Sequence, residues 1–452
     1  MKFTDFFFYL SLILHLEALE CKHLLECEEL LNLLQRHCSN GGFKNFDYLL
    51  ETRILNKEND SFKKMLESLD KDGCSLLHYA AKGGSVDILE TLLKHCSERN
   101  LTDRDHLGHT LLHIACKHGR YDMCAFLLSK EDYRKYQMNI KSKNHWNAAH
   151  FTAECGNFRI FEFLRTKKFD DMKSETADGY NILDIACMNN KMDFIKEIIA
   201  KHSELNPLLY KSDTRDWNIT HIAARAGNRD ILEFLLNGYI DIEVAKEKTH
   251  HEKTILHICC EKGHYELCKF IAENEHLNVM LGDIDHNRWN ALHFCAKGGN
   301  LDAFKYIKSK NILDDETIDS KTALHICCIH KHLEIAKYLC DEINSQGKNI
   351  NELKTKRWWT PAHYVAVEIK QDGSEEKLIR ILVDAGIDLT AKTEKGQTVL
   401  IVACEHRNKN LVRYLVKEHT ELLKIETDFL KKAAECDAEI KDIIDNCFKK
   451  SS

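Results

Sequence analysis

Histidine and cysteine are the residues of this chain whose spacing suggests chemistry. The sequence contains 26 His and 19 Cys. Three His–Cys pairs lie three residues apart in apolar stretches: His113 with Cys116, His257 with Cys260, and His325 with Cys328. On a helix this spacing places both side chains on one face. A structural zinc site needs four converging ligands, usually including close cysteine pairs. The pairs alone do not meet that requirement, so we expect no metal site and no cofactor.

The cysteines recur at a position that suits a small apolar residue. Five of them occupy the same place in a repeated motif: Cys116, Cys187, Cys260, Cys328 and Cys404. Free cysteine behaves as a small hydrophobic residue, whereas a disulfide framework is typical of short secreted domains. We therefore interpret these residues as reduced core thiols, which favours a cytoplasmic location.

Reactive thiols and catalytic motifs have little support in the sequence. Cys259 and Cys260 are adjacent, as are Cys327 and Cys328, and neighbours on a helix point in different directions. A reactive cysteine needs exposure and a nearby positive group, and Cys155 is the best candidate. The chain has no phosphate-binding glycine-rich loop, nucleophile elbow or kinase signature. We expect no catalytic residue, and thus no enzyme.

The elements that position these residues follow from a repeated motif. It is clearest in Ser75-Leu-Leu-His78, Thr110-Leu-Leu-His113, Thr254-Ile-Leu-His257 and Thr322-Ala-Leu-His325. Ten copies occur, with centres about 32 to 38 residues apart. Three residues before each centre stands Ser, Thr or Asn: Ser75, Thr110, Asn147, Asn181, Asn218, Thr254, Asn290, Thr322, Thr360 and Thr398. These side chains accept hydrogen bonds from the free N–H groups of a first helical turn. The pattern predicts ten helix starts.

Each predicted helix start is followed by a helix end and a second apolar stretch. Glycine stands six residues after the centre in six copies: Gly84, Gly119, Gly156, Gly227, Gly263 and Gly299. Glycine at such a position favours the end of a helix. Residues 86–93 and 231–236 are examples of the second stretch. Each copy therefore predicts a turn, a helix, a glycine and a second helix.

This unit resembles the ankyrin repeat, whose signature is Thr-Pro-Leu-His-x-Ala. The resemblance covers residues 69–417 and implies an all-α solenoid of about ten helix-turn-helix repeats. It also implies that the motif His hydrogen-bonds to neighbouring backbone. The chain departs from the signature in three ways. The proline remains only as Pro361, Asp184 replaces the motif His in the fourth copy, and Ile401 replaces it in the tenth.

The flanking segments, residues 1–68 and 418–452, are predicted as helical caps, because a solenoid needs polar ends. Residues 1–18 also have the outline of a signal peptide, with Lys2 before an apolar run over 6–14. The alternative is that this run belongs to a capping helix that continues through residues 15–38. A cytoplasmic and a secreted protein both remain open. No apolar run approaches the length of a membrane span.

Tryptophan marks every second repeat. The residue before the capping position is Trp in four copies, about 71 residues apart: Trp146, Trp217, Trp289 and Trp359. We call these four residues the Trp ladder. The intervening copies end their core motif in Cys, whereas the Trp copies end it in Ala. The sequence therefore predicts that a pair of repeats is the larger structural unit.

The resemblance implies a partner-binding surface. In the ankyrin family, the residue before the cap lies on a projecting turn, and the two residues after the small pair lie on the concave face. Here these positions hold the Trp ladder and six polar residues: Lys117, His118, Arg225, Glu261, Lys262 and Lys297. Tryptophan can anchor an interface. It can equally pack against the neighbouring turn and hold the array together, and the polar residues can be an ordinary solvated face.

The function that follows is protein binding. The net charge of −7 argues against a general nucleic-acid binder. We expect a monomeric adaptor or scaffold that binds a protein partner, with no membrane span in this chain. Two alternatives remain. Long, divergent, Cys-rich arrays are similar to the cytoplasmic region of ankyrin-type transient receptor potential channels, so the chain is alternatively such a region or a truncated relative. If residues 1–18 are a signal peptide, it is a secreted ankyrin-repeat effector.

Overall fold

The computed structural model describes residues 31–41, 68–95, 102–129, 131–169, 171–310, 315–367, 373–425 and 427–451. These residues form helices, turns and loops, with no strand among them. The predicted all-α repeat fold is confirmed. The possible signal peptide over 1–18 lies outside the described residues. Of the predicted cap over 1–68, residues 31–40 form a helix.

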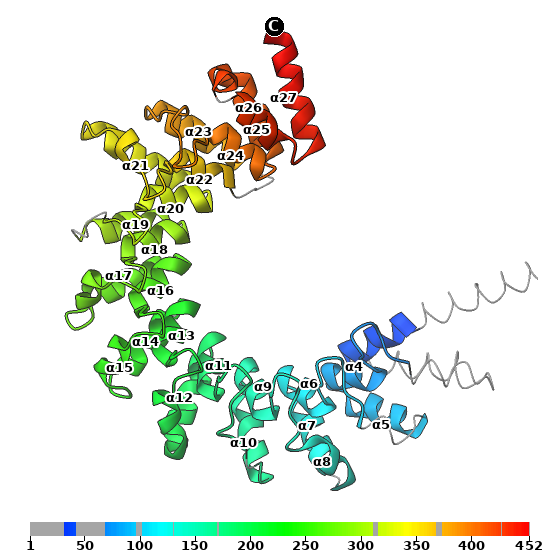
Figure 1. Ribbon diagram of the computed structural model, residues 1–452. Helices are drawn as coiled ribbons and strands as arrows, with labels where there is room; N and C mark the ends of the chain where they lie inside the picture. Colours follow the sequence, from blue (N-terminus) through cyan, green and yellow to red (C-terminus); the bar gives the residue numbers. More distant parts are fainter. Residues whose placement is uncertain are drawn as a thin grey trace, which may run out of the picture. The chain divides into compact units, whose positions relative to one another are not determined.

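The chain forms two compact units, Met1–Thr214 and Arg215–Ser452. In the first unit, helices follow one another in pairs. The pairs are α4 (Leu76–Gly83) with α5 (Val86–His95), α6 (Leu111–Lys117) with α7 (Tyr121–Ser129), α9 (Ala148–Cys155) with α10 (Phe158–Thr166), and α11 (Ile182–Met188) with α12 (Met192–Lys201). Two short helices, α8 (Glu131–Gln137) and the 3-10 helix η3 (Ser203–Tyr210), follow second helices. The first helices pack in one row and the second helices in another (Figure 1).

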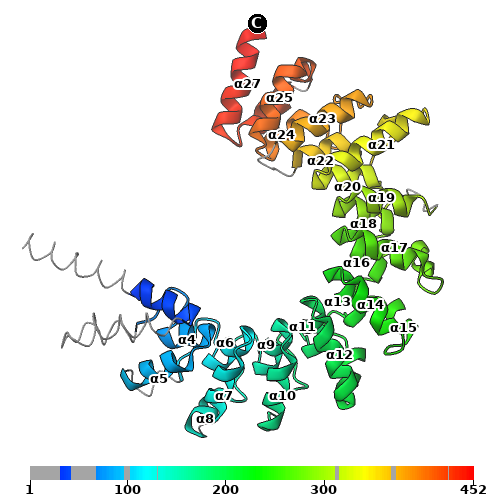
Figure 2. The same ribbon diagram turned by 180° about the vertical axis from the view of Figure 1, so that it is seen from behind.

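The second unit repeats this arrangement. Its pairs are α13 (Ile219–Ala226) with α14 (Arg229–Leu236), α16 (Ile255–Lys262) with α17 (Tyr265–Glu273), α18 (Ala291–Gly298) with α19 (Leu301–Lys308), α20 (Ala323–His330) with α21 (Leu333–Ser345), α22 (Pro361–Val367) with α23 (Ser374–Asp384), and α24 (Val399–Glu405) with α25 (Lys409–Glu418). Four short elements connect pairs: α15 (Ile242–Lys246), η4 (Asn278–Gly282), η5 (Ile350–Glu352) and η6 (Thr420–Lys424). The two rows are also visible from behind (Figure 2).

Two further helices end the second unit. The helices α26 (Thr427–Ala434) and α27 (Ala438–Ser451) pack against α24 and α25. Leu430, Ile440 and Ile444 are fully buried there, while the intervening positions carry Lys, Asp and Glu. The predicted domain boundaries at 68/69 and 417/418 stay predictions.

The first helices begin where the sequence predicts. Asn218 illustrates the cap: its Oδ1 accepts hydrogen bonds from the backbone N–H groups of Thr220 at 3.0 Å and His221 at 3.3 Å. The backbone N–H of Asn218 donates in return to Nδ1 of His221 at 3.3 Å. This reciprocal pair is a capping box in which His takes the place of the usual Glu or Gln. It satisfies N–H groups that a helix start otherwise leaves free.

The core lies between the two rows of helices. Small residues such as Ala223 and Ala224 on α13 are fully buried, which lets neighbouring first helices approach closely. The recurring cysteines fill the same layer and are also fully buried: Cys116, Cys187, Cys260, Cys328 and Cys404. The prediction that these thiols are core residues is confirmed.

Candidate interaction surface

A tight turn, here called a finger, precedes each first helix. In the finger before α18, the Asp285 N–H donates to the Trp289 carbonyl at 3.0 Å, and the Arg288 N–H donates to the Asp285 carbonyl at 2.9 Å. Arg288 has φ +59°, in the left-handed region. The residue two before the cap has positive φ in each of these fingers: Gly73, Gly108, His145, Gly179, Asp216, Glu252, Arg288, Ser320, Trp358 and Gly396. A single left-handed residue therefore turns the chain in every finger.

Backbone hydrogen bonds join successive fingers within each unit. In the first unit, the Lys143 N–H donates to the Leu107 carbonyl at 2.9 Å. In the second unit, the Ile318 N–H donates to the Asn287 carbonyl at the same distance. These bonds fix the spacing of the side chains that the fingers carry.

In five repeats the motif His ties its first helix to the segment that leads into the next finger or ends it. His257 accepts a hydrogen bond at Nδ1 from the Thr254 N–H, at 3.3 Å. Its Nε2 lies 3.2 Å from the carbonyl oxygen of Asp283. Because Nδ1 accepts, Nε2 carries the proton and donates. Burial lowers the pKa of His257 to about 4, so the ring is neutral. Both nitrogens are engaged, which leaves none to bind a metal with Cys260.

Each tryptophan of the Trp ladder packs against the motif His of its own helix. The ring centroids lie 6.0 Å apart for Trp146–His150, Trp217–His221 and Trp289–His293, and 5.8 Å apart for Trp359–His363. All four indole rings are half-buried. Each Trp therefore covers its own helix start and still presents one side to solvent.

A second aromatic ring extends three members of the ladder. It stands five residues after the tryptophan, as Phe151, Phe294 or Tyr364. The ring centroids are 5.2 Å apart for Trp146–Phe151, 5.3 Å for Trp289–Phe294 and 5.0 Å for Trp359–Tyr364. The position after Trp217 holds Ile222 instead. There the guanidinium groups of Arg215 and Arg225 lie 5.5 and 5.8 Å from the indole centroid.

The preceding repeat places a cationic or imidazole group on this second ring. Lys253 Nζ lies 4.8 Å from the Phe294 centroid, and Lys321 Nζ lies 5.6 Å from the Tyr364 centroid. The His109 ring meets Phe151 edge-on at 5.1 Å. These distances are typical of cation–π and edge-to-face contacts.

We call each set of Trp, following aromatic residue and preceding Lys or His a composite patch. The three composite patches are Trp146–Phe151–His109, Trp289–Phe294–Lys253 and Trp359–Tyr364–Lys321. Every patch is formed by two successive repeats, in line with the pair of repeats that the Trp spacing predicts as the larger unit. Six of these nine residues were not predicted from the sequence, although each stands at a fixed number of residues from a capping position.

The predicted helix residues lie beside these patches. Glu261 is held between Lys253 Nζ at 2.8 Å and Lys297 Nζ at 2.6 Å. Partial burial alone would raise the pKa of Glu261, but the two ammonium groups outweigh it and keep the pKa below its usual range. Lys117 is exposed and lies 3.4 Å from Glu154. The structure thus joins Glu261 and Lys297 directly.

The remaining predicted helix residues are exposed. Lys262 and Arg225 are exposed on α16 and α13, and His118 is exposed at the end of α6. Partial burial, followed by the charges of Lys82 and Lys117, lowers the pKa of His118. Each of these side chains is solvated on its own helix, and no contact that would join them into a site is observed among the described residues.

A hollow of about 520 Å³ opens beside the end of α6. It is lined by Lys117, His118, Gly119, Cys155, Gly156, Asn157 and Phe158. Cys155 is half-buried, and its thiol donates a long hydrogen bond to the Thr152 carbonyl at 3.5 Å. Burial raises the pKa of Cys155 despite nearby Lys191. A raised pKa lowers the thiolate fraction, which agrees with the weak support that the sequence gives to a reactive thiol at Cys155.

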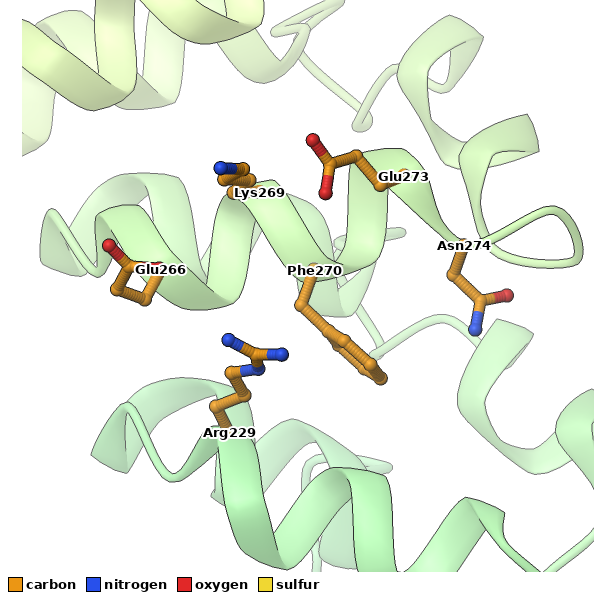
Figure 3. Close-up of a pocket in the computed structure, with 6 residues that line it drawn as sticks. All are labelled: Arg229, Glu266, Lys269, Phe270, Glu273 and Asn274. Carbon is orange, nitrogen blue, oxygen red and sulfur yellow. The ribbon is translucent and has the colours of Figure 1, made fainter.

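A second hollow of about 340 Å³ lies on the second-helix side of the second unit. It is lined by Arg229, Glu266, Lys269, Phe270, Glu273 and Asn274. Figure 3 shows Arg229 reaching from α14 toward the Phe270 ring on α17, and the guanidinium carbon is 5.5 Å from the ring centroid. Groups of both charges surround this hollow, which suits polar contact with a partner. No motif in the sequence predicts this hollow.

Comparison with known sequences identifies the repeat. The family described as ankyrin repeats (3 copies) matches residues 14–138, 205–283, 274–352 and 343–427. The family described as ankyrin repeats (many copies) matches residues 112–165. The chain is also 24% identical over 181 residues to human transient receptor potential cation channel subfamily A member 1. That match covers 40% of this chain and 15% of the relative, so the chain spans a small part of the relative's length. Among the described helices, none has the length and apolarity needed to cross a membrane.

Proposed function

Because the chain belongs to the ankyrin-repeat family, we propose that it is an adaptor or scaffold that binds a protein partner through its fingers and first helices. The composite patches carry this proposal. Each brings a half-buried indole together with a second ring and a lysine or histidine. The Phe151 and Phe294 rings are buried and support the indole from below, whereas Tyr364 is half-buried. Aromatic residues are enriched at protein interfaces because they bury a large area at low entropic cost.

The geometry favours a partner that presents apolar side chains beside acidic ones. The Trp rings are already held by the motif His, so little side-chain freedom is lost on binding. Lys253 and Lys321 each lie over an aromatic face. Lys253 already pairs with Glu261 at 2.8 Å, and Lys321 Nζ lies 3.5 Å from Asp319. A carboxylate on the partner would share or replace these pairs while an apolar side chain covers the neighbouring indole. Repetition within the second unit allows an extended partner to meet the Trp289 and Trp359 patches at once.

Co-purification with quantitative mass spectrometry tests the proposal. The wild-type chain is compared with a variant that carries Trp→Ala at positions 146, 217, 289 and 359, after circular dichroism has shown that the variant is folded. The matched control, Arg229→Ala with Glu266→Ala, alters the second-helix hollow instead. We expect the Trp variant to lose a partner that the control retains. A folded Trp variant that keeps every partner would assign the ladder to stability alone.

The proposal includes a cytoplasmic, monomeric protein whose role is binding rather than catalysis. Its support is the use of cysteine as a buried apolar residue in the recurring core position, as for Cys116, Cys260 and Cys404. Such thiols are compatible with a reducing compartment. Size-exclusion chromatography with light scattering tests the oligomeric state, and a dimer mass would contradict it.

A second candidate function is the ankyrin region of a cation channel, or a relative of such a region. The observation that favours it is the 24% identity over 181 residues to a transient receptor potential channel. Sequencing of the transcript beyond Ser452 separates the two functions. A reading frame that continues into several apolar segments of about 20 residues supports the channel. A stop codon directly after Ser452 contradicts it.

A further inference from the structure

Three buried cysteines converge between the two helices of one repeat. Cys259 and Cys260 lie on α16, and Cys268 lies on α17. The Sγ of Cys268 is 3.0 Å from that of Cys259 and 3.6 Å from that of Cys260. All three sulfurs lie within 4.8 Å of one another, and all three residues are fully buried. We predicted that Cys259 and Cys260 point in different directions, but in the structure both reach Cys268.

The surroundings of this cluster offer three ligands rather than four. The nearest motif His, His257, uses both ring nitrogens in hydrogen bonds to backbone groups. The Nε2 of His264 is hydrogen-bonded to the Arg225 carbonyl oxygen at 3.0 Å. Cys295 contacts Cys260 but stands outside the group of mutually close sulfurs. A structural zinc ion takes four ligands in tetrahedral geometry, so the donor set does not suit zinc.

We propose that Cys259, Cys260 and Cys268 form a three-sulfur site for a soft monovalent metal ion, copper(I). Thiolate sulfur is the ligand type that selects copper(I) over harder ions. Binding involves no change of oxidation state. The ion forms bonds to the three sulfurs, and each sulfur that becomes a thiolate releases one proton to solvent. The bound ion would link α16 to α17 within a single repeat.

Burial makes this site dependent on the metal. Desolvation raises the pKa of Cys259 and Cys260. For Cys268, the hydrogen bond with Cys259 lowers the pKa, but the hydrogen bond with Cys260 and burial outweigh it, so the pKa is raised. Without metal, the thiols therefore stay protonated and unreactive. Because the ion must displace protons, copper(I) affinity falls as the pH falls.

Two other repeats of the chain provide natural controls. Repeat eight has Cys327 and Cys328 on α20 at the positions of Cys259 and Cys260, but fully buried Ala336 on α21 replaces Cys268. Repeat two has the pair Cys116–Cys124, with sulfurs 3.7 Å apart, but Ala115 replaces the first cysteine. Each lacks one of the three sulfurs.

Anaerobic titration of the reduced full-length chain with copper(I), against a colorimetric copper(I) chelator, tests the site. We expect the Cys268→Ala variant to bind one copper(I) ion fewer per chain with high affinity than wild type. The Ala336→Cys variant, which completes the second trio, should bind one more. Cys124→Ala should leave the number of tight equivalents unchanged. X-ray absorption at the copper edge should show three sulfur neighbours.

Each contrary result would overturn the site. Equal tight copper(I) binding by wild type and Cys268→Ala would remove it, as would the absence of tight binding by wild type. A zinc(II) titration that gives the same tight equivalent, lost in the same variant, would assign the site to zinc instead. The gain by Ala336→Cys keeps the test decisive even if Cys268→Ala fails to fold.

Discussion

The Nε2 of His221 lies 3.1 Å from the backbone oxygen of Glu247, and this contact ties α13 to the next finger. The same contact, at 3.1 Å, joins His113 to Ile140 and His150 to Ser174. The Nε2 of His363 lies 3.1 Å from the oxygen of Gln397, which directly precedes the next capping residue, Thr398. In each case Nδ1 accepts from a backbone N–H at the cap, so the proton is on Nε2. The fold thus depends on a series of neutral imidazoles.

This dependence predicts acid sensitivity. Burial lowers the pKa of His113 to about 3 and that of His150, His257, His325 and His363 to about 4, from an ordinary 6.5. The unfolded chain takes up protons near pH 6.5 and the folded chain does not. Stability is therefore full above 6.5 and falls as the pH falls toward 4, by at most about 1.4 kcal/mol per pH unit for each His.

Urea denaturation between pH 7.5 and 5 measures this effect. The midpoint should fall steeply below pH 6.5. His257→Gln should be less stable at pH 7.5 and show a shallower pH dependence, since one titrating group is gone. The control His286→Gln alters an exposed residue and should keep the wild-type slope. A midpoint that does not change between pH 7 and 5 would contradict the neutral imidazoles.

Asp184 reverses this dependence in the fourth repeat. Its Oδ2 accepts the Asn181 N–H at 3.0 Å, as the motif His would, but its buried Oδ1 has no hydrogen-bond partner. Burial raises the pKa of Asp184 well above 3.8. A carboxyl whose pKa is raised on folding favours the folded state at low pH, and this contribution is lost as the pH rises through the folded-state pKa.

The Asp184→Asn variant tests this reading. The amide keeps an oxygen for the Asn181 N–H and removes the ionisation, so we expect about 1 to 3 kcal/mol of added stability at pH 7.5. The gain should shrink toward zero at low pH, where Asp184 is itself protonated. Urea midpoints at pH 7.5 and 5 measure the difference. An equal or lower stability of the variant at pH 7.5 would show that Asp184 is satisfied in another way.

Local features of the fold could be predicted from the sequence, and features that join repeats could not. A helix start depends on a side chain and an N–H group that are three residues apart in the sequence, as for Asn218 and His221. The capping residues could therefore be predicted from the sequence. The contact between Lys253 and Phe294 spans two repeats and depends on how fingers stack. The approach of Cys268 to Cys259 depends on the angle between two helices. Neither distance is encoded in a single motif.

A glycine substitution at a finger residue with positive φ should stabilise the folded protein. Arg288 adopts φ +59°, whereas the same position is Gly108 or Gly179 in other fingers. A left-handed conformation costs a non-glycine residue about 1 to 2 kcal/mol, and glycine adopts it freely. Because glycine also gains freedom in the unfolded chain, we expect Arg288→Gly to stabilise by about 0.5 to 1 kcal/mol.

Thermal unfolding of paired variants measures this effect. The reverse change, Gly108→Ala, should destabilise, because its Cβ would lie 3.0 Å from the backbone nitrogen of Lys143 while φ is +82°. Arg288→Ala separates the loss of the side chain from the relief of strain and should not stabilise. If Arg288→Gly lowers the melting temperature, the arginine side chain contributes more than the backbone strain costs.

The lysines of the composite patches predict how binding depends on charge. Lys253 and Lys321 lie over Phe294 and Tyr364 at the finger side, where they can meet a carboxylate of the partner. We expect the double variant Lys253→Ala, Lys321→Ala to weaken binding about tenfold, which corresponds to about 1.4 kcal/mol. Lys253→Arg with Lys321→Arg should restore most of the affinity, since a guanidinium also stacks on aromatic rings.

The salt dependence of binding distinguishes this role from a structural one. Screening weakens pairs between exposed charges, so the affinity of wild type should fall between 50 and 300 mM NaCl, and that of the alanine variant should fall less. Titration calorimetry with the purified partner measures both, and urea denaturation checks that the variant is folded. Lys269→Ala, in the second-helix hollow, is the matched control. If the alanine variant keeps the wild-type affinity and salt dependence, the lysines only pack against the aromatic rings. Partner recognition would then depend on Trp289 and Trp359.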